Sequence, residues 1–403
     1  MTEKGTLTWT NWRGKEENRP INYTLDIQWQ PRNDLAIELG YVGNVGRHQV
    51  IPVPFNQAQI ATPSGPIHGQ QYSYGYTVLD PNSFNPITLP NGQPFLANYE
   101  GGNVDLRVPY TGYASESIDY KAAGVAAYNA LQAHIEKRLS HGFQIGASYT
   151  YSHALDEQSG LGLFYNGNNP LNLRDGYASS DFDRTHAANI NFVYHLPAFF
   201  NKNTLEGRFV DGWSLIGLAV IQSGQPYSVI DYTGAVGSIY YSVFNGITNP
   251  IVPLAPGCTA QNAKTGTSGA FGTPALKSSC FTLPLLSPGD LGGAVPAGDT
   301  YETTFTTGQR NIFRQSAQKR ADISIAKDTQ LRETLILRYT LDIFNLTNTT
   351  SFDIPVDNVS QNENYDNFPV EGQPLYNAPG GLGITNKAIG SSRQIQMSLR
   401  LNF

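Results

Sequence analysis

Residues 394–403, at the end of the chain, alternate without exception between polar and apolar side chains. Successive side chains of a β-strand point to opposite faces, so this segment predicts a strand with one wholly polar and one wholly apolar face. The segment also ends on an aromatic residue. Its apolar positions are Ile395, Met397, Leu399, Leu401 and Phe403. Such a strand requires a fold in which one sheet face meets an apolar environment.

The same alternation recurs along the chain and predicts eight further strands. A tenth strand is expected in residues 5–12. The eight are expected in residues 22–29, 35–41, 131–139, 143–151, 188–196, 213–221, 323–325 and 335–343. The dominant local structure is therefore β, with its apolar positions at a period of two.

The connections between these strands are alternately short and long. The short ones are residues 31–34, 140–142, 198–210 and 328–333, and the long ones are residues 44–123, 156–184, 224–319 and 346–392. In an up-and-down meander, strict alternation puts every short turn at one end, which is typical of transmembrane barrels. Long unstructured loops are uncommon in compact soluble domains. We therefore predict an all-β, antiparallel, up-and-down transmembrane β-barrel segment of about nine or ten strands.

Two lysines test this orientation. Lys137 and Lys327 intrude on the predicted apolar faces, and each lies next to a short turn. A long lysine stem can reach from such a position to a polar interface, whereas a cation at the bilayer midplane costs about 2–4 kcal/mol. Their placement favours a lipid-facing surface, and the same orientation puts Phe403 at the short-turn end.

Composition agrees with a barrel. Only 14% of the residues are charged, against about a quarter in soluble globular proteins. No segment approaches the ~18 consecutive apolar residues of a membrane helix, so any membrane spanning has to be by strands. The net charge of −6 argues against nucleic acid as a partner. Residues 1–6 are polar and carry no apolar signal core. We therefore expect that the true beginning of the protein lies upstream.

Several short motifs appear in a fixed order between residue 20 and the end of the chain. They occupy residues 40–46, 128–132, 148–156, 181–186, 222–227, 308–314 and 344–348. Together with the terminal Phe403, the chain resembles the C-terminal half of a TonB-dependent outer-membrane receptor. It looks most like the Oar-like group, in which a carboxypeptidase-regulatory-like domain and a plug precede a large barrel.

The resemblance implies active uptake of a bulky, unidentified ligand across the outer membrane of a Gram-negative cell, with the long loops extracellular. Residues 1–403 would be one barrel segment, lacking the N-terminal domain and the plug through which the TonB complex acts. Large transporter barrels have about 22 strands, so nine or ten would form less than half of the wall. We also expect contact with outer-membrane lipid, and with the barrel-assembly machinery through the C-terminal strand.

Three alternatives remain open. A ten-strand barrel could close on itself, and the chain could be a stand-alone outer-membrane structural or adhesive protein. A soluble carbohydrate-binding β-protein is a further alternative, although it should have long connections at both ends. The sequence contains no G-x-S-x-G motif, no phosphate-binding loop and no metal-binding histidine pattern. We therefore predict no enzyme activity, no catalytic residue, no metal and no cofactor.

Three groups of residues are candidate sites. Cys258 and Cys280 lie in the longest loop, where a disulfide is favoured over two free thiols. Asp175, Asp181, Asp183 and His186 could form a calcium cluster, an acid/base group, or a charged and hydrogen-bonded network that includes Arg184. The network is favoured because the carboxylate spacing is irregular. Loop tyrosines could stack on a ligand, but an aromatic girdle or packing within the loops is favoured. They are Tyr72, Tyr74, Tyr76, Tyr240 and Tyr241.

Overall fold

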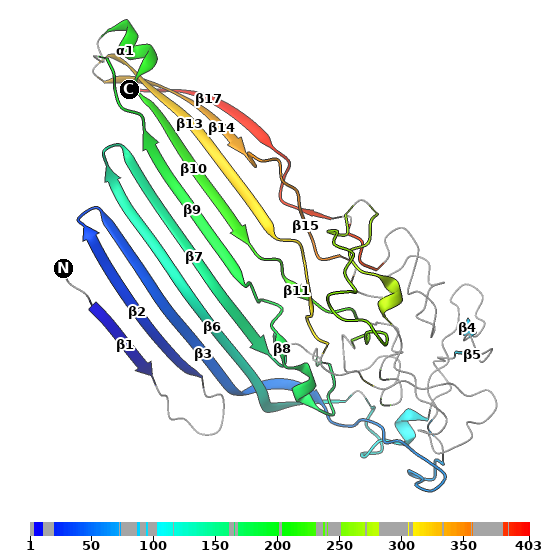
Figure 1. Ribbon diagram of the computed structural model, residues 1–403. Helices are drawn as coiled ribbons and strands as arrows, with labels where there is room; N and C mark the ends of the chain where they lie inside the picture. Colours follow the sequence, from blue (N-terminus) through cyan, green and yellow to red (C-terminus); the bar gives the residue numbers. More distant parts are fainter. Residues whose placement is uncertain are drawn as a thin grey trace.

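The fold is a single large antiparallel sheet with irregular loops gathered at one end of its strands (Figure 1). A computed structural model provides the coordinates. It describes residues 4–10, 20–71, 73, 87–88, 94–95, 103–115, 117–160, 165, 168–200, 204–230, 237, 240, 251–270, 272–281, 305, 309–332, 334–355, 357, 382–385 and 387–403.

Ten long strands, each hydrogen-bonded to the next in chain order, form the sheet. They are β1 (Lys4–Thr10), β2 (Ile21–Arg32), β3 (Leu35–Pro54), β6 (Ile118–Ser140), β7 (Phe143–Asp156), β9 (His186–His195), β10 (Trp213–Gln222), β13 (Gln318–Arg332), β14 (Leu335–Phe344) and β17 (Gln394–Asn402). The short strand β8 (Ala178–Ser179) adds an eleventh beside β7. The ten predicted strands are therefore all present, and the predicted up-and-down order is confirmed.

Short elements occupy the connections. They are β4 (Ile87–Thr88), β5 (Pro94–Phe95), β8 (Ala178–Ser179), β11 (Pro226–Tyr227), β12 (Phe313–Arg314), β15 (Ser351–Phe352), β16 (Ala388–Ile389), the helix α1 (Leu205–Val210) and the 3₁₀ turns η1 (Val104–Leu106), η2 (Leu173–Gly176) and η3 (Ser278–Cys280). No helix among the described residues has the length and apolar character needed to cross a bilayer.

The register aligns the predicted apolar positions across the sheet. Because Cα partners on neighbouring strands share a face, a row of partners shows which side chains lie together. One row runs through Ile27, Leu39, Ala133, Tyr149, Ala188 and Ile221. Another runs through Phe143, Tyr194, Leu215, Ile325, Leu341 and Met397. The apolar face is therefore continuous from β2 to β17, as the alternation predicted.

The opposite face is mostly polar. One of its rows runs through Gln28, Glu38, His134, Ser148 and Asn189. Strand β10 departs from this pattern, because Ile216 and Leu218 lie on the same parity as Ser214 and Gln222. This strand is apolar on both faces, which explains why its alternation is irregular in the sequence.

The predicted loop boundaries at residues 44 and 123 are wrong. Strand β3 continues to Pro54 and β6 begins at Ile118, and the two strands pair over this whole extension. The alternation is lost at the end of β3 because the consecutive residues 51–54 are all buried, on both faces of the strand. Ile51 and Val53 are buried and pack around Tyr165. Alternation of polar and apolar residues marks only the part of a strand whose two faces lie in different environments.

Lys137 and Lys327, the two lysines predicted on the apolar face, both reach the short-turn end, whereas Lys319, which pairs with Ile221 on the same face, lies toward the long-loop end. The Lys137 ammonium donates to the Ser140 hydroxyl at 2.7 Å and to the Phe143 carbonyl at 2.9 Å, and it lies 3.6 Å from the Asp34 carboxylate. The hydrogen bond from Ser140 lowers the pKa of Asp34. The Lys327 ammonium donates to the Asp211 carbonyl. The placement predicted for a lipid-facing surface is confirmed.

Within the described residues, the two outermost strands each have a neighbour on one side only. Strand β1 pairs with β2, and β17 pairs with β14. The sheet is therefore open between β1 and β17.

Candidate functional site

Four of the sequence motifs meet at the long-loop end of the sheet. Asp156 ends β7, Asp181 lies in the turn after β8, and Ser228 follows β11. Arg310 and Asn311 precede β12. These segments are far apart in sequence, and hydrogen bonds from their side chains to one another and to the backbone hold them together. This cluster is the candidate site.

Arg310 is the centre of the cluster, with only 3% of its surface exposed. Its guanidinium donates to a carboxylate oxygen of Asp156 at 2.7 Å and to the backbone carbonyl of the same residue at 2.8 Å. It also donates to the Ser159 hydroxyl at 2.6 Å, the Gly176 carbonyl at 3.1 Å and the Asp181 carboxylate at 3.3 Å. A buried arginine needs this many partners because an unpaired buried charge is costly.

Asn311 fixes the direction of the chain beside Arg310. Its φ is 56°, in the left-handed region that asparagine adopts more readily than most residues. Its backbone N–H donates to the Ser228 hydroxyl at 2.8 Å. Its side-chain amide donates to the Ser179 carbonyl and to the Asp181 carboxylate, both at 2.7 Å. The residue therefore ties the loop before β12 to the loops after β8 and β11.

A second ion pair lies beside the first. The Arg314 guanidinium donates to the Asp183 carboxylate, whose residue is 1% exposed. The other oxygen of that carboxylate accepts the backbone N–H of Ala154 at 2.7 Å and lies 3.4 Å from the imidazole of His153. Burial, followed by the charge of Arg314, lowers the pKa of Arg184. This pair links the end of β7 to β12.

Gly224 allows β11 and β12 to approach each other. A Cβ atom on Gly224 would overlap the backbone carbonyl of Gln315. Gln315 donates its backbone N–H to the carbonyl of Gln225 at 2.9 Å. The buried Tyr227 then packs on Phe313, with ring centroids 5.8 Å apart. The glycine in the motif at residues 222–227 is therefore required by a close backbone contact.

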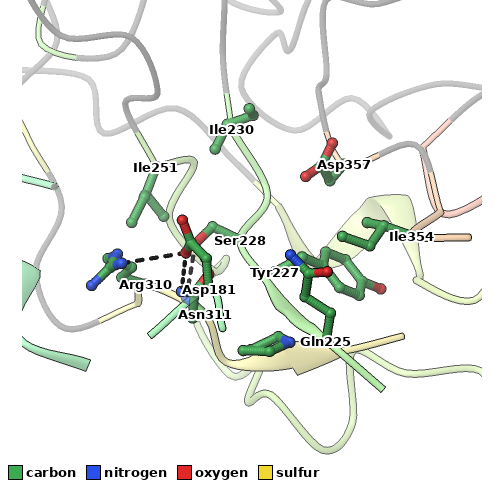
Figure 2. Close-up of a pocket in the computed structure, with 11 residues that line it drawn as sticks. Asp181, Gln225, Tyr227, Ser228, Ile230, Ile251, Arg310, Asn311, Ile354 and Asp357 are labelled. Atoms are coloured by element: carbon green, nitrogen blue, oxygen red, sulfur yellow. Dashed lines mark hydrogen bonds and ion pairs between the residues drawn. The ribbon is translucent and has the colours of Figure 1, made fainter. Parts of the chain in front are cut away.

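A cavity of about 180 Å³ adjoins the cluster (Figure 2). Its lining residues are Asp181, Gln225, Pro226, Tyr227, Ser228, Ile230, Ile251, Arg310, Asn311, Ile354 and Asp357. In Figure 2 Arg310 and Asp181 lie on one side of it and Asp357 on the other. Burial raises the pKa of Asp357 to about 6 and is also the main cause that raises the pKa of Tyr227. The cavity thus combines apolar walls with two carboxyl groups.

The acidic residues predicted as one cluster do not form a single site. Asp181 and Asp183 pair with arginines, which agrees with the predicted charged network. Asp175 accepts hydrogen bonds from the side chains of Asn169 and Asn172. His186 contacts the Tyr149 hydroxyl at 2.8 Å. Among the residues that the structure describes, no three metal-ligating side chains are grouped.

The cysteines and one tyrosine can be placed. Cys258 and Cys280 are joined by a disulfide, with their Cα atoms 5.5 Å apart. Tyr240 stacks on Phe305, with ring centroids 5.2 Å apart. It therefore packs within its own loop region, one of the arrangements considered for the loop tyrosines. The other candidate tyrosines lie outside the described residues: Tyr72, Tyr74, Tyr76 and Tyr241.

Arg310 lies in the motif at residues 308–314, but no role was predicted for it from the sequence. Its signal was present, because an arginine in a loop poor in charge needs a partner. The partner itself, Asp156, is 154 positions away. Nothing in the local pattern points from one residue to the other.

Several solved outer-membrane proteins resemble the fold at low identity. The ferric-catecholate import receptor Fiu from Escherichia coli K12, in its closed form, has a TM-score of 0.38 and 11% identity, covering 96% of this chain and 28% of its own. The pyoverdine outer membrane receptor FpvA from Pseudomonas aeruginosa PAO1 has a TM-score of 0.37 and 12% identity, and the match covers 100% of this chain and 33% of the receptor. The outer membrane transporter YddB from Escherichia coli has a TM-score of 0.36 and 8% identity, covering 96% and 33%.

The chain thus spans about a third or less of the length of these structures. Among curated protein sequences, none matches it. A family model described as an outer membrane beta barrel domain matches residues 7–396, nearly the whole chain. The chain is therefore a member of the outer membrane beta-barrel domain family, and it resides in the outer membrane.

Proposed function

We propose that the chain forms part of the barrel wall of an outer-membrane receptor that takes up a bulky ligand. The observation that carries this proposal is the open edge of the sheet. Unpaired strand edges are not tolerated in lipid, because their N–H and C=O groups have no partner there. Further strands between β17 and β1 would complete the wall, and barrel diameter grows with strand number. A wide lumen is what a bulky ligand requires.

The inner face supports the same proposal. Its exposed or half-buried polar side chains include Glu38, His134 and Arg320, and barrels of transporters have polar interiors. Four of the motifs that resemble the Oar-like receptors, at residues 148–156, 181–186, 222–227 and 308–314, lie toward the loop end, where the ion pairs of Arg310 and Arg314 hold the loops. In this proposal the chain is the C-terminal half of such a receptor, and the TonB complex acts on it only through a plug supplied elsewhere.

A photo-crosslinking experiment in the outer membrane of the native host tests the wall. A benzophenone amino acid replaces Ser398 on β17, and mass spectrometry identifies the crosslinked peptide. Attachment to a peptide that belongs neither to residues 4–10 nor to the neighbouring strand β14 supports a larger wall. Attachment to residues 4–10 of the same chain means that ten strands close on themselves, which contradicts the proposal.

A matched control uses Thr340 on β14, whose neighbours are Ala326 on one side and Ser398 on the other. The same benzophenone at this position should crosslink to those two strands. An antibody against residues 393–403 gives an independent measure, because a receptor of the proposed kind runs well above the calculated 44.0 kDa. A band near 44 kDa in the outer-membrane fraction favours a stand-alone structural or adhesive barrel.

Uptake needs its own measurement. The host with and without the gene is grown in the same medium, and mass spectrometry follows compounds too large for general porins. Energised uptake predicts that at least one such compound is depleted only when the gene is present, and that an ionophore stops the depletion. Equal depletion in both strains contradicts a receptor function even if the wall is large.

A further inference from the structure

The connection between β9 and β10, residues 196–212, carries exposed apolar side chains at the short-turn end. Figure 1 shows α1 beyond the strand ends, at the opposite end of the sheet from the long loops. Phe199, Leu205 and Phe209 have 69%, 71% and 75% of their surface exposed. Two other short turns, at residues 33–34 and 141–142, carry Asn-Asp and His-Gly instead. This connection is therefore unlike them in both length and character.

Local hydrogen bonds fix the apolar side chains on one surface. The Thr204 hydroxyl accepts the backbone N–H of Gly207 at 3.1 Å and caps α1. The Asp211 carboxylate, beyond the other end of α1, accepts the backbone N–H groups of Phe199 and Phe200 at 2.8 and 2.9 Å. The two phenylalanines are thereby held beside the helix.

The helix turns its apolar face outward. Leu205 and Phe209 are four positions apart and so share one face of α1. Gly207 is buried, and the helix packs against β13. Arg208 is exposed on the turn between them. The segment is therefore amphipathic, with its apolar side directed away from the protein.

This surface is continuous with the lipid-facing side of the sheet. Leu196 and Trp213, at the two ends of the connection, lie on the apolar parity, and the Leu196 N–H donates to the Trp213 carbonyl at 2.9 Å. The Lys327 ammonium lies 5.2 Å from the Trp213 ring centroid and donates to the Asp211 carbonyl. Tryptophan rings and lysine heads gather at the membrane–water interface. The level of α1 is thus the boundary of the bilayer.

We propose that residues 196–200 and 204–212 form an interfacial anchor, whose Phe199–Phe200 pair and Leu205–Phe209 face enter the phospholipid leaflet at the short-turn end. Exposed apolar patches of this kind mark membrane or protein contacts, and continuity with the lipid-facing strands selects the membrane. Exposed aromatic and aliphatic residues flanked by the charged side chains of Glu206 and Arg208 suit the headgroup boundary. The anchor would fix the height of β9 and β10 in the bilayer.

Spin labelling tests the anchor. The only two cysteines of the sequence form the disulfide, so a single introduced cysteine can be labelled selectively. Phe209→Cys is labelled with a nitroxide in outer-membrane vesicles, and Leu205→Cys is a second variant in case the first assembles poorly. Collisions with oxygen report lipid exposure, and collisions with a water-soluble nickel chelate report water exposure. We expect high oxygen and low nickel accessibility at both positions.

His141→Cys is the matched control, because residue 141 is exposed in a short turn at the same end of the sheet. Its label should have the opposite ratio. Nickel accessibility at positions 205 and 209 equal to that at 141 would overturn the proposal, since the patch would then lie in water. Low accessibility to both reagents would overturn it as well, because protein would then cover the patch.

Discussion

Replacing Arg310 by methionine should release the long loops while leaving the sheet in place. Methionine keeps an unbranched apolar stem but removes every hydrogen-bond donor. The substitution leaves the Asp156 carboxylate without its ion-pair partner, and that side chain is only 10% exposed. Asp181 loses less, because 41% of its side chain is exposed and water can replace the arginine.

The expected cost follows from these exposures. Removing one partner of a buried ion pair destabilises by about 3–5 kcal/mol. Asp156 keeps two contacts from the Ser159 hydroxyl, at 3.0 and 2.9 Å, so we expect the lower end, about 3 kcal/mol. Since about 1.4 kcal/mol corresponds to a tenfold change in an equilibrium constant, the open population of the loops should rise about a hundredfold.

Limited proteolysis of the protein in membranes measures this population when opening is fast relative to cleavage. Cleavage after β7 should accelerate about a hundredfold in Arg310→Met, from the stability cost derived above, while heat-dependent gel mobility stays that of a folded barrel. The control is Arg320→Met. The Arg320 side chain is half exposed in its ion pair with Asp322, and such a pair is worth about 0–1 kcal/mol. Equal cleavage rates in the two variants would refute the reasoning. Adding Asp156→Leu to Arg310→Met should recover part of the protection, because no unpaired buried charge remains.

Other regions give further predictions. Reducing the Cys258–Cys280 disulfide opens a loop of 22 positions and should cost about 3 kcal/mol of local stability; alkylation and mass measurement with and without reductant would show no difference if the thiols are free. Gly224→Ala should impair assembly, judged by the heat-modifiable fraction, because its Cβ meets a backbone carbonyl, whereas Gly160→Ala has open space and should be neutral. Folding raises the pKa of Asp357 from 3.8 to about 6, so the folded protein keeps a proton that the unfolded chain loses between these values, and stability falls as pH rises through that window. Protection factors, which compare each exchange rate with that of an unfolded chain at the same pH, should therefore be higher around the cavity at pH 4 than at pH 7, and Asp357→Asn should abolish this difference in protection.

The sheet could be predicted from the sequence because lipid imposes a regular pattern on every strand. Ile395 and Met397 are apolar for the same reason as their partners Ile343 and Leu341, since all four lie on the lipid-facing side. The pattern fails where that constraint ends. Residues 51–54, at the end of β3, are buried on both faces of the strand, so their residue types follow local packing instead of the bilayer.

The candidate site was less predictable for a different reason. Its ion pairs join residues more than 100 positions apart, such as Arg314 and Asp183, and no local periodicity encodes such a pairing. The acidic residues at 181 and 183 were found, but Asp175 was grouped with them only because it is near in sequence. Asn311 carried a usable signal, since asparagine tolerates the left-handed conformation that the turn requires.

The bonding of Arg310 limits what the cavity can recognise. Both terminal nitrogens of its guanidinium already donate to groups of the chain itself. An anionic ligand that took these donors would have to break the ion pair with Asp156. The buried Asp156 carboxylate would then lack a cationic partner, which is costly. The motif residues therefore hold the loops, and ligand preference has to come from other groups. If the chain is part of the receptor proposed above, variants of Arg310 should change how much intact protein reaches the membrane without changing which ligand is preferred. A changed preference at unchanged abundance would mean that the guanidinium contacts the ligand after all.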